Sequence, residues 1–133
     1  MKHRVDYRVY YEDTDAGGIM YHGNYINFCE RGRTEFMREI GHSCSEIQEK
    51  DGVLFVIRHL EADYLMSCKL EEMLTVETCV AEMKNTSFIM NQSIFRHDNV
   101  LFKMRVTAVC IDDKGKPVRI PDKLRQDITT YCE

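Results

Sequence analysis

The sequence predicts an α+β fold in which one long helix packs against a curled antiparallel sheet of about five strands. Three observations lead to this prediction. Residues 5–11 alternate between apolar and polar side chains, residues 25–40 carry apolar side chains at every third or fourth position, and four later segments are rich in β-branched and aromatic residues. A helix with one strongly apolar face needs a covering layer, and these strands supply it.

The length and composition indicate one folded domain over residues 1–133. Hydrophobic residues make up 44% of the chain and charged residues 30%, with two prolines and no low-complexity run. Such a composition is typical of a packed globular core rather than of a disordered chain.

The first predicted element is a half-buried strand over residues 5–11. Its apolar positions recur with the period of two that a strand requires, and they are Val5, Tyr7, Val9 and Tyr11. A turn that contains Gly17 and Gly18 follows, and after it the period changes from two to between three and four.

One amphipathic helix of about 17 residues, roughly 26 Å long, is predicted after this turn. Its apolar face consists of Tyr25, Phe28, Cys29, Gly32, Phe36 and Ile40. Gly41 is expected to end the helix as a C-cap. Because glycine costs about 1 kcal/mol relative to alanine inside a helix, Gly32 on the apolar face predicts that the helix backbone approaches the sheet closely there.

Four strands are predicted to complete the sheet, at residues 53–65, 74–83, 87–95 and 100–111. Turn residues at 84–86 and 97–99 predict an antiparallel meander. The last strand has Phe102 and Val106 on one face and Lys103 on the other, so one face is expected to contact the helix and the other to face solvent or a partner. After a polar turn at 112–117, Asp122 is expected to cap a small helix that ends near Asp127.

Charge and cysteine content disfavour several classes of protein. A net charge of -4 at pH 7 argues against nucleic-acid binding, which requires a basic surface. The sequence shows no signal-peptide pattern and no apolar run near the roughly 18 residues of a membrane span. We therefore expect a cytoplasmic protein, with peripheral contact with the inner membrane left open. Its cysteines have no C-x-x-C spacing and are expected to be reduced thiols at Cys29, Cys44, Cys68, Cys79, Cys110 and Cys132.

Residues 10–25 hold the candidate catalytic groups, in the sequence YYEDTDAGGIMYHGNY. Asp15 precedes the Gly17-Gly18 turn and a helix start, an arrangement that places a carboxylate near free backbone N–H groups and suits attack on a carbonyl group. Two roles remain open for Asp13: a catalytic role, or a structural role in which it binds its own backbone, as aspartates in turns often do. Two roles are also open for His22. Its side chain either caps the helix start or packs against a neighbouring residue, or its backbone N–H stabilises a developing oxyanion.

Several other kinds of site are disfavoured, and no metal or cofactor is predicted. An EF-hand calcium loop beginning at Asp13 would have Gly17 at its fifth position and Asn24 at its twelfth, where the motif needs an oxygen ligand and a glutamate. There is no zinc-type spacing and no Gly-x-Ser-x-Gly elbow. Glu30 and Glu35 have arginines three or four residues away, which favours a solvated helix face over a catalytic role.

Two segments of the chain resemble a known family. Residues 11–25, with the pattern D-x-D-x-x-G-x-x-Y from Asp13 to Tyr21, and residues 29–35, with the sequence CERGRTE, resemble the hotdog-fold acyl-CoA thioesterases. The most similar branch is the YbgC, or Tol-Pal-associated, group within the 4-hydroxybenzoyl-CoA thioesterase family. The family fold is a long helix wrapped by an antiparallel sheet, which agrees with the fold predicted from periodicity.

The resemblance implies hydrolysis of an acyl-CoA thioester to a carboxylic acid and free CoA. Asp15 would act as nucleophile or general base, and the helix start at His22 would polarise the thioester carbonyl. The implied partners are the acyl-CoA substrate, a second or further copies of the chain in a homodimer or homotetramer with shared active sites, and acyl carrier protein as another thiol carrier. The implied substrate-binding residues are Tyr11, Gly18, Tyr21, Tyr25, Lys84, Thr86 and Arg119.

Two alternatives remain open at this point. A β-hydroxyacyl thioester dehydratase on the same fold would depend on His22 or Glu30 rather than on Asp15. A non-catalytic scaffold would bind acyl-CoA or acyl carrier protein without releasing thiol.

Overall fold

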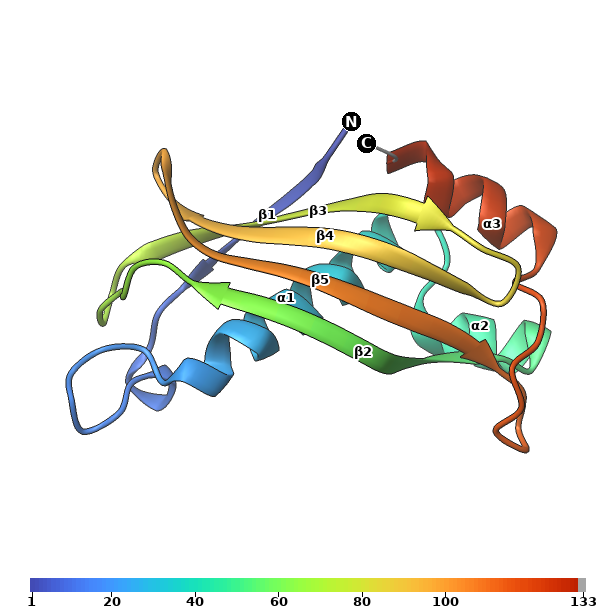
Figure 1. Cartoon of the computed structure of the whole chain (residues 1–133), viewed down its shortest axis with the longest axis horizontal. Helices are drawn as coiled ribbons and strands as arrows, with labels where there is room; N and C mark the ends of the chain where they lie inside the picture. The colour runs from blue at the N-terminus through green and yellow to red at the C-terminus, as the bar shows by residue number, and fades with distance from the viewer. Residues whose placement is uncertain (132–133) are drawn as a thin grey trace.

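A five-stranded antiparallel sheet curls around one long helix in the computed structural model, which describes residues 1–131 (Figure 1). The strands are β1 (His3–Arg8), β2 (Leu54–Tyr64), β3 (Met73–Met83), β4 (Ser87–Arg96) and β5 (Asn99–Ile111). The helices are α1 (His22–Glu39), α2 (Cys44–Asp51) and α3 (Asp122–Ile128), with the short 3-10 turns η1 (Tyr11–Asp13) and η2 (Thr129–Tyr131). The α+β class predicted from the sequence is confirmed.

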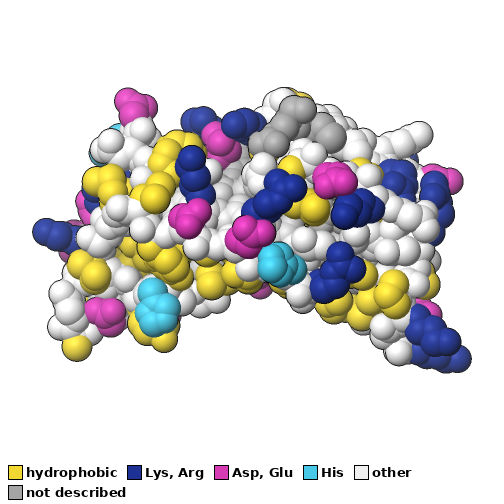
Figure 2. Space-filling view, in the orientation of Figure 1, with side chains coloured by type: hydrophobic (Ala, Val, Ile, Leu, Met, Phe, Trp, Pro, Cys, Tyr) yellow, Lys and Arg dark blue, Asp and Glu magenta, His cyan; other side chains and the backbone are white. Residues whose placement is uncertain are grey.

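The helix α1 lies against one face of the sheet, and its predicted apolar face is buried (Figure 1). Phe28 and Phe36 are fully buried in the same core cluster as Phe102 and Val106 of β5, so that strand presents the face expected from its alternation. The helix ends near Gly41 as predicted, but its C-cap residue is Ile40, and Gly41 follows the cap with φ of 85°. On the side of the molecule seen in Figure 2, positive and negative side chains are interspersed.

Gly32 is the point of closest approach between α1 and the sheet. A Cβ atom built on Gly32 would lie 2.6 Å from Cγ1 of Val76 and 3.5 Å from Nε2 of Gln92. Val76 is completely buried in β3, so it has no free space into which to move. The close approach predicted from the sequence is confirmed.

We expect Gly32→Val to lower the free energy of unfolding by about 2 kcal/mol. Forcing side-chain atoms into a packed core costs roughly 1–3 kcal/mol. Valine has a higher helix propensity than glycine, but this difference recovers only about a few tenths of a kcal/mol. Urea unfolding measures the difference. Gly23→Ala is a matched control, because its new Cβ would meet only the half-exposed ring of Tyr21. An unchanged or higher stability of Gly32→Val would contradict the packing described above.

The strand order differs from the predicted meander at one position. The order is β1-β3-β4-β5-β2, so β3, β4 and β5 form consecutive hairpins as predicted, while β2 lies beyond β5 rather than beside β3. Leu54 pairs with Ile111 and Tyr64 pairs with Phe102. Consecutive turns predict neighbours only where the connection is short, and residues 65–72 are long enough to cross to the far side of the sheet. The outer edge of β2 has no neighbouring strand among the described residues.

The first strand is shorter than predicted, because the chain leaves the sheet before Tyr11. β1 ends at Arg8, and Tyr11 begins η1. The carboxylate of Asp13 accepts a hydrogen bond from the backbone N–H of Tyr10 at 2.9 Å, and this bond turns the chain away from the strand direction. Tyr11 is consequently 81% exposed rather than half-buried.

Two helical details also differ from the prediction. The helix α2 was not assigned from the sequence, although its signals are present: Ser43 accepts a hydrogen bond from the N–H of Glu46, and Gly52 ends the helix with φ of 65°. α3 begins after Pro121, so Asp122 is its first residue rather than its cap.

Arg33 does not lie on the solvated face of α1 that was expected for it. Its guanidinium donates a hydrogen bond to Oε1 of Gln92 at 2.9 Å, and burial lowers the pKa of Arg33. Glu35 and Arg38 do form the expected i,i+3 ion pair on the exposed side of the helix. The charged residues of α1 are therefore divided between a half-buried position, at Arg33, and the exposed side of the helix.

His3 is a buried imidazole with an unsatisfied ring nitrogen. Its ring packs edge-on against Phe36 and Tyr131, and its Nδ1 atom has no hydrogen-bond partner among residues 1–131. Burial lowers the pKa of His3 from its ordinary 6.5, and the nearby carboxylates of Glu39 and Glu35 oppose this effect only in part. The folded state therefore favours neutral His3.

This burial predicts a loss of stability in mild acid. The unfolded chain binds a proton at position 3 near pH 6.5 while the folded chain resists it, so the free energy of unfolding falls as the pH drops below this value. One proton contributes a slope of at most about 1.4 kcal/mol per pH unit. His3→Phe keeps an aromatic ring and removes the titration, so its unfolding free energy should change less between about pH 7.5 and 5.5 than that of the wild type. Equal slopes would exclude His3 as the cause.

The cysteines and the helices agree with the remaining expectations for the described residues. The cysteines at 29, 44, 68, 79 and 110 are thiols, and Cys132 lies outside the described residues. No helix within residues 1–131 combines the length and the apolar character that crossing a membrane requires.

Candidate active site

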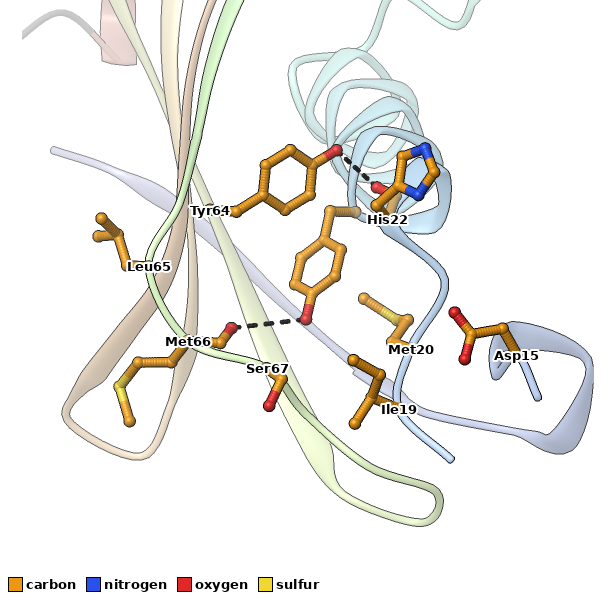
Figure 3. Close-up of a pocket in the computed structure, with 9 residues that line it drawn as sticks. Asp15, Ile19, Met20, His22, Tyr64, Leu65, Met66 and Ser67 are labelled. Carbon is orange, nitrogen blue, oxygen red and sulfur yellow. Dashed lines mark hydrogen bonds between the residues drawn. The ribbon is translucent and has the colours of Figure 1, made fainter. Parts of the chain in front are cut away.

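A cavity of about 330 Å³ lies between the loop that precedes α1, the start of α1 and the end of β2 (Figure 3). Figure 3 shows Asp15 on the loop side of this cavity and Tyr64 and Leu65 on the strand side. The residues that line it are Asp15, Ile19, Met20, His22, Tyr25, Tyr64, Leu65, Met66 and Ser67.

Asp15 is held in a tight turn that leaves part of its carboxylate unengaged. The Gly17 N–H donates to Oδ1 at 2.8 Å, and the Gly18 N–H donates to the Asp15 carbonyl at 3.0 Å. Gly18 has φ of 81°, a conformation that glycine adopts without strain. Oδ2 has no hydrogen-bond partner within residues 1–131, so it is free to accept one from a bound molecule.

Asp13 has a structural role instead. Its side chain is buried, with 3% of the residue exposed. Oδ2 accepts the Tyr10 N–H at 2.9 Å, Oδ1 accepts Nδ2 of Asn24 at 3.0 Å, and the Asp13 carbonyl accepts the Tyr21 N–H at 2.9 Å. Asp13 therefore ties the loop to the first turn of α1, which is the turn-supporting role left open by the sequence.

The start of α1 presents backbone donors toward this region. α1 begins at His22 and has no side-chain cap, and the Asn24 N–H already donates to the Tyr21 carbonyl at 2.9 Å. The N–H groups of His22 and Gly23 have no carbonyl partner within the helix, and the helix dipole places partial positive charge there. Such a helix end favours an oxygen that carries negative charge.

Two tyrosines form the wall opposite Asp15. The Tyr25 hydroxyl lies 3.5 Å from Sγ of Cys68 and donates a long hydrogen bond of 3.5 Å to the Met66 carbonyl. The Tyr64 hydroxyl donates a much shorter bond, 2.6 Å, to the His22 carbonyl. Burial raises the pKa of both tyrosines, so both hydroxyls stay protonated and act as donors at neutral pH.

The structure brings together some of the sequence-predicted site residues and not others. Asp15, His22 and Tyr25 line the cavity, Gly18 lies in the turn that holds Asp15, and the half-exposed Tyr21 ring packs on His22 with centroids 4.4 Å apart. Tyr11 instead lines a separate, smaller hollow on the surface.

Lys84, Thr86 and Arg119 lie at the other end of the sheet. The turn containing Lys84 and Thr86 adjoins Ser87, which pairs with Val109, and the Arg119 guanidinium bonds to Oδ1 of Asn85 at 2.8 Å. The eleven residues of β2 separate the two ends by roughly 33 Å. A single chain therefore does not bring these three residues to the Asp15 cavity.

Sequence reasoning missed the strand-side wall of the cavity. Tyr64, Leu65, Met66 and Ser67 come from the end of β2 and the residues after it, 42 to 45 positions beyond His22. No local pattern marks them as site residues. Among the residues that the structure describes, no cluster of three or more His, Cys, Asp or Glu side chains is placed to hold a metal ion.

Comparison with known proteins places the chain in a family. Residues 9–128 match the family model described as the thioesterase-like superfamily. The chain belongs to this superfamily. Among curated members, it is 40% identical over 119 residues to the acyl-CoA thioesterase YbgC of Haemophilus influenzae, a match that covers 89% of this chain and 88% of the relative. It is 39% identical to the acyl-CoA thioester hydrolase YbgC of Escherichia coli, with 88% of each chain covered.

Solved structures of the superfamily agree with the fold. A probable thioesterase from Bartonella henselae superimposes with a TM-score of 0.88 at 33% identity, covering 91% of this chain and all of the other. These matches confirm the predicted hotdog fold, the resemblance to the YbgC-type thioesterases and the class of thioester hydrolase.

Proposed function

We propose that this chain hydrolyses acyl-CoA thioesters to a carboxylic acid and free CoA, with Asp15 as the catalytic carboxylate. One observation carries the proposal: a carboxylate with one unengaged oxygen lines the same cavity as an uncapped helix start. The names of the YbgC relatives support acyl-CoA as the thioester.

The cavity suits a simple addition and elimination. With the thioester carbonyl oxygen near the N–H groups of His22 and Gly23, Asp15 takes a proton from water as the water oxygen bonds to the carbonyl carbon. Collapse of the tetrahedral intermediate breaks the C–S bond, the thiolate leaves with CoA, and the proton returns to it. If Asp15 attacks directly, the acid is released by hydrolysis of the resulting anhydride. One oxyanion donor of this kind is worth about 3–4 kcal/mol.

We further propose that the working unit contains a second copy paired along the outer edge of β2. That edge carries unpaired backbone groups and exposed apolar side chains at Val56, Ile57 and Leu60. Antiparallel pairing of two β2 strands would place the Leu54 end of one copy beside the Tyr64 end of the other. The Lys84 and Arg119 end of the partner would then approach the cavity, where CoA phosphates need cations. A monomer in light scattering would exclude this arrangement.

A thiol-release assay tests the proposed activity. Wild-type protein is mixed with short, long and aromatic acyl-CoAs, and free CoA thiol is measured alongside a matched Asp15→Asn sample. Turnover of at least one class by the wild type is expected. Tight acyl-CoA binding without thiol release would support a scaffold. Loss of water from a β-hydroxyacyl-CoA, without thiol release, that depends on His22 or Glu30 and survives in Asp15→Asn would support a dehydratase.

A further inference from the structure

We propose that Tyr64 is a positioning residue, whose hydroxyl holds the first peptide of α1 in the orientation that thioester hydrolysis requires. This inference rests on the proposed function. The observation behind it is the 2.6 Å hydrogen bond from the Tyr64 hydroxyl to the His22 carbonyl, which joins the end of β2 to the helix start (Figure 3).

The His22 carbonyl belongs to the same peptide group as the Gly23 N–H. Gly23 is one of the first-turn donors without a carbonyl partner inside the helix. A strong bond to the carbonyl oxygen polarises the whole peptide group, so it makes the Gly23 N–H a better donor. The same bond adds a constraint from the sheet to a peptide whose carbonyl already lies in the first turn of the helix.

The sheet and a cluster of aromatic rings anchor Tyr64. Tyr64 pairs with Phe102 of β5 in the sheet. The backbone N–H of the next residue, Leu65, donates to the Leu101 carbonyl at 2.8 Å. The Tyr64 ring packs edge-on against Phe102 and Tyr25 with centroids 4.9 and 5.3 Å away. The hydroxyl is therefore presented from the sheet, which moves less than a loop.

Asp13 supplies the other tie to the same helix turn. It bonds Asn24 through its side chain and Tyr21 through its carbonyl, and it fixes the helix start to the loop that carries Asp15. Tyr64 fixes that start to the opposite wall of the cavity. The two ties hold the helix start from both sides of the cavity, and that of Tyr64 acts directly on the peptide that carries the Gly23 N–H.

Tyr64→Phe tests this role, because it keeps the ring packing and removes only the hydroxyl. We expect kcat for thiol release to fall about tenfold, the equivalent of one lost hydrogen bond. KM should change less than twofold and the shape of the pH profile should stay the same. Backbone amide exchange at residues 22–25 should become faster. Tyr7→Phe is the matched control, because Tyr7 is a half-buried tyrosine that packs on Phe28 and does not line the cavity.

The possible results separate this inference from the proposed function. Wild-type kcat and wild-type amide exchange in Tyr64→Phe would overturn the positioning role alone. A higher KM with unchanged kcat would also overturn it, because Tyr64 would then contact substrate instead of holding the helix. Absence of thiol release in the wild type would overturn the proposed function and the positioning role with it.

Discussion

Asp15→Asn should lower kcat for acyl-CoA hydrolysis by about 10²–10⁴-fold, the range typical of a positioned acid or base. The amide side chain retains an oxygen that can accept the Gly17 N–H, so the turn that holds position 15 is preserved. An amide neither accepts a proton from water nor attacks a thioester at neutral pH. Thiol-release kinetics with saturating acyl-CoA measure the effect.

Glu12→Gln provides the matched control for this variant. Glu12 is an exposed carboxylate three residues from Asp15, and it does not line the cavity. The substitution makes the same change of charge in the same loop, so it should keep the wild-type rate. If Asp15→Asn retained wild-type activity, Asp15 would not be the catalytic carboxylate.

Asp13→Asn should lower the free energy of unfolding by about 2–3 kcal/mol, the upper part of the range for an unsatisfied buried polar group. Both oxygens of Asp13 accept hydrogen bonds in a buried position, from the Tyr10 N–H and from Asn24 Nδ2. An asparagine must turn its NH₂ group toward one of these donors. If the NH₂ group faces Asn24, the Asn24 amide must turn over to present Oδ1, which breaks the 3.0 Å bond that Oδ1 accepts from Nδ2 of Asn27, so one bond is lost in either orientation. Urea unfolding monitored by circular dichroism measures the loss.

The two aspartates should therefore respond in opposite ways. Asp15 is exposed and bonds only within its own turn through its side chain, so Asp15→Asn is expected to keep its stability within about 0.5 kcal/mol of the wild type. Asp13→Asn should lose stability first and activity only as a consequence. If Asp13→Asn were as stable as the wild type but inactive, Asp13 rather than Asp15 would be the catalytic aspartate.

Elements with a long or regular pattern were predicted well from the sequence. The apolar repeat from Tyr25 to Ile40 predicts α1, and Gly32 on that face predicts the close contact with Val76. The Gly17-Gly18 turn before a helix predicts an exposed carboxylate near backbone donors. These features depend on residues within a few positions of one another, and so a local reading is sufficient.

Elements whose conformation depends on distant partners were predicted less well. Tyr11 continues an alternating pattern, yet the buried Asp13 carboxylate draws the chain out of the strand at this point. Arg33 looks like a surface charge, but Gln92 of β4 draws its guanidinium inward. In both cases a hydrogen bond outweighs the local preference.

The sequence by itself determined the class of the fold, the long helix, the three consecutive hairpin strands and the aspartate-glycine turn that precedes the helix. Periodicity and turn chemistry specify these because both operate over a few residues. Only the tertiary structure decided that β2 pairs with β5 and that Tyr64 reaches the His22 carbonyl across 42 positions of sequence. The strand order is selected by the burial of the whole apolar face at once, a quantity that no short segment contains.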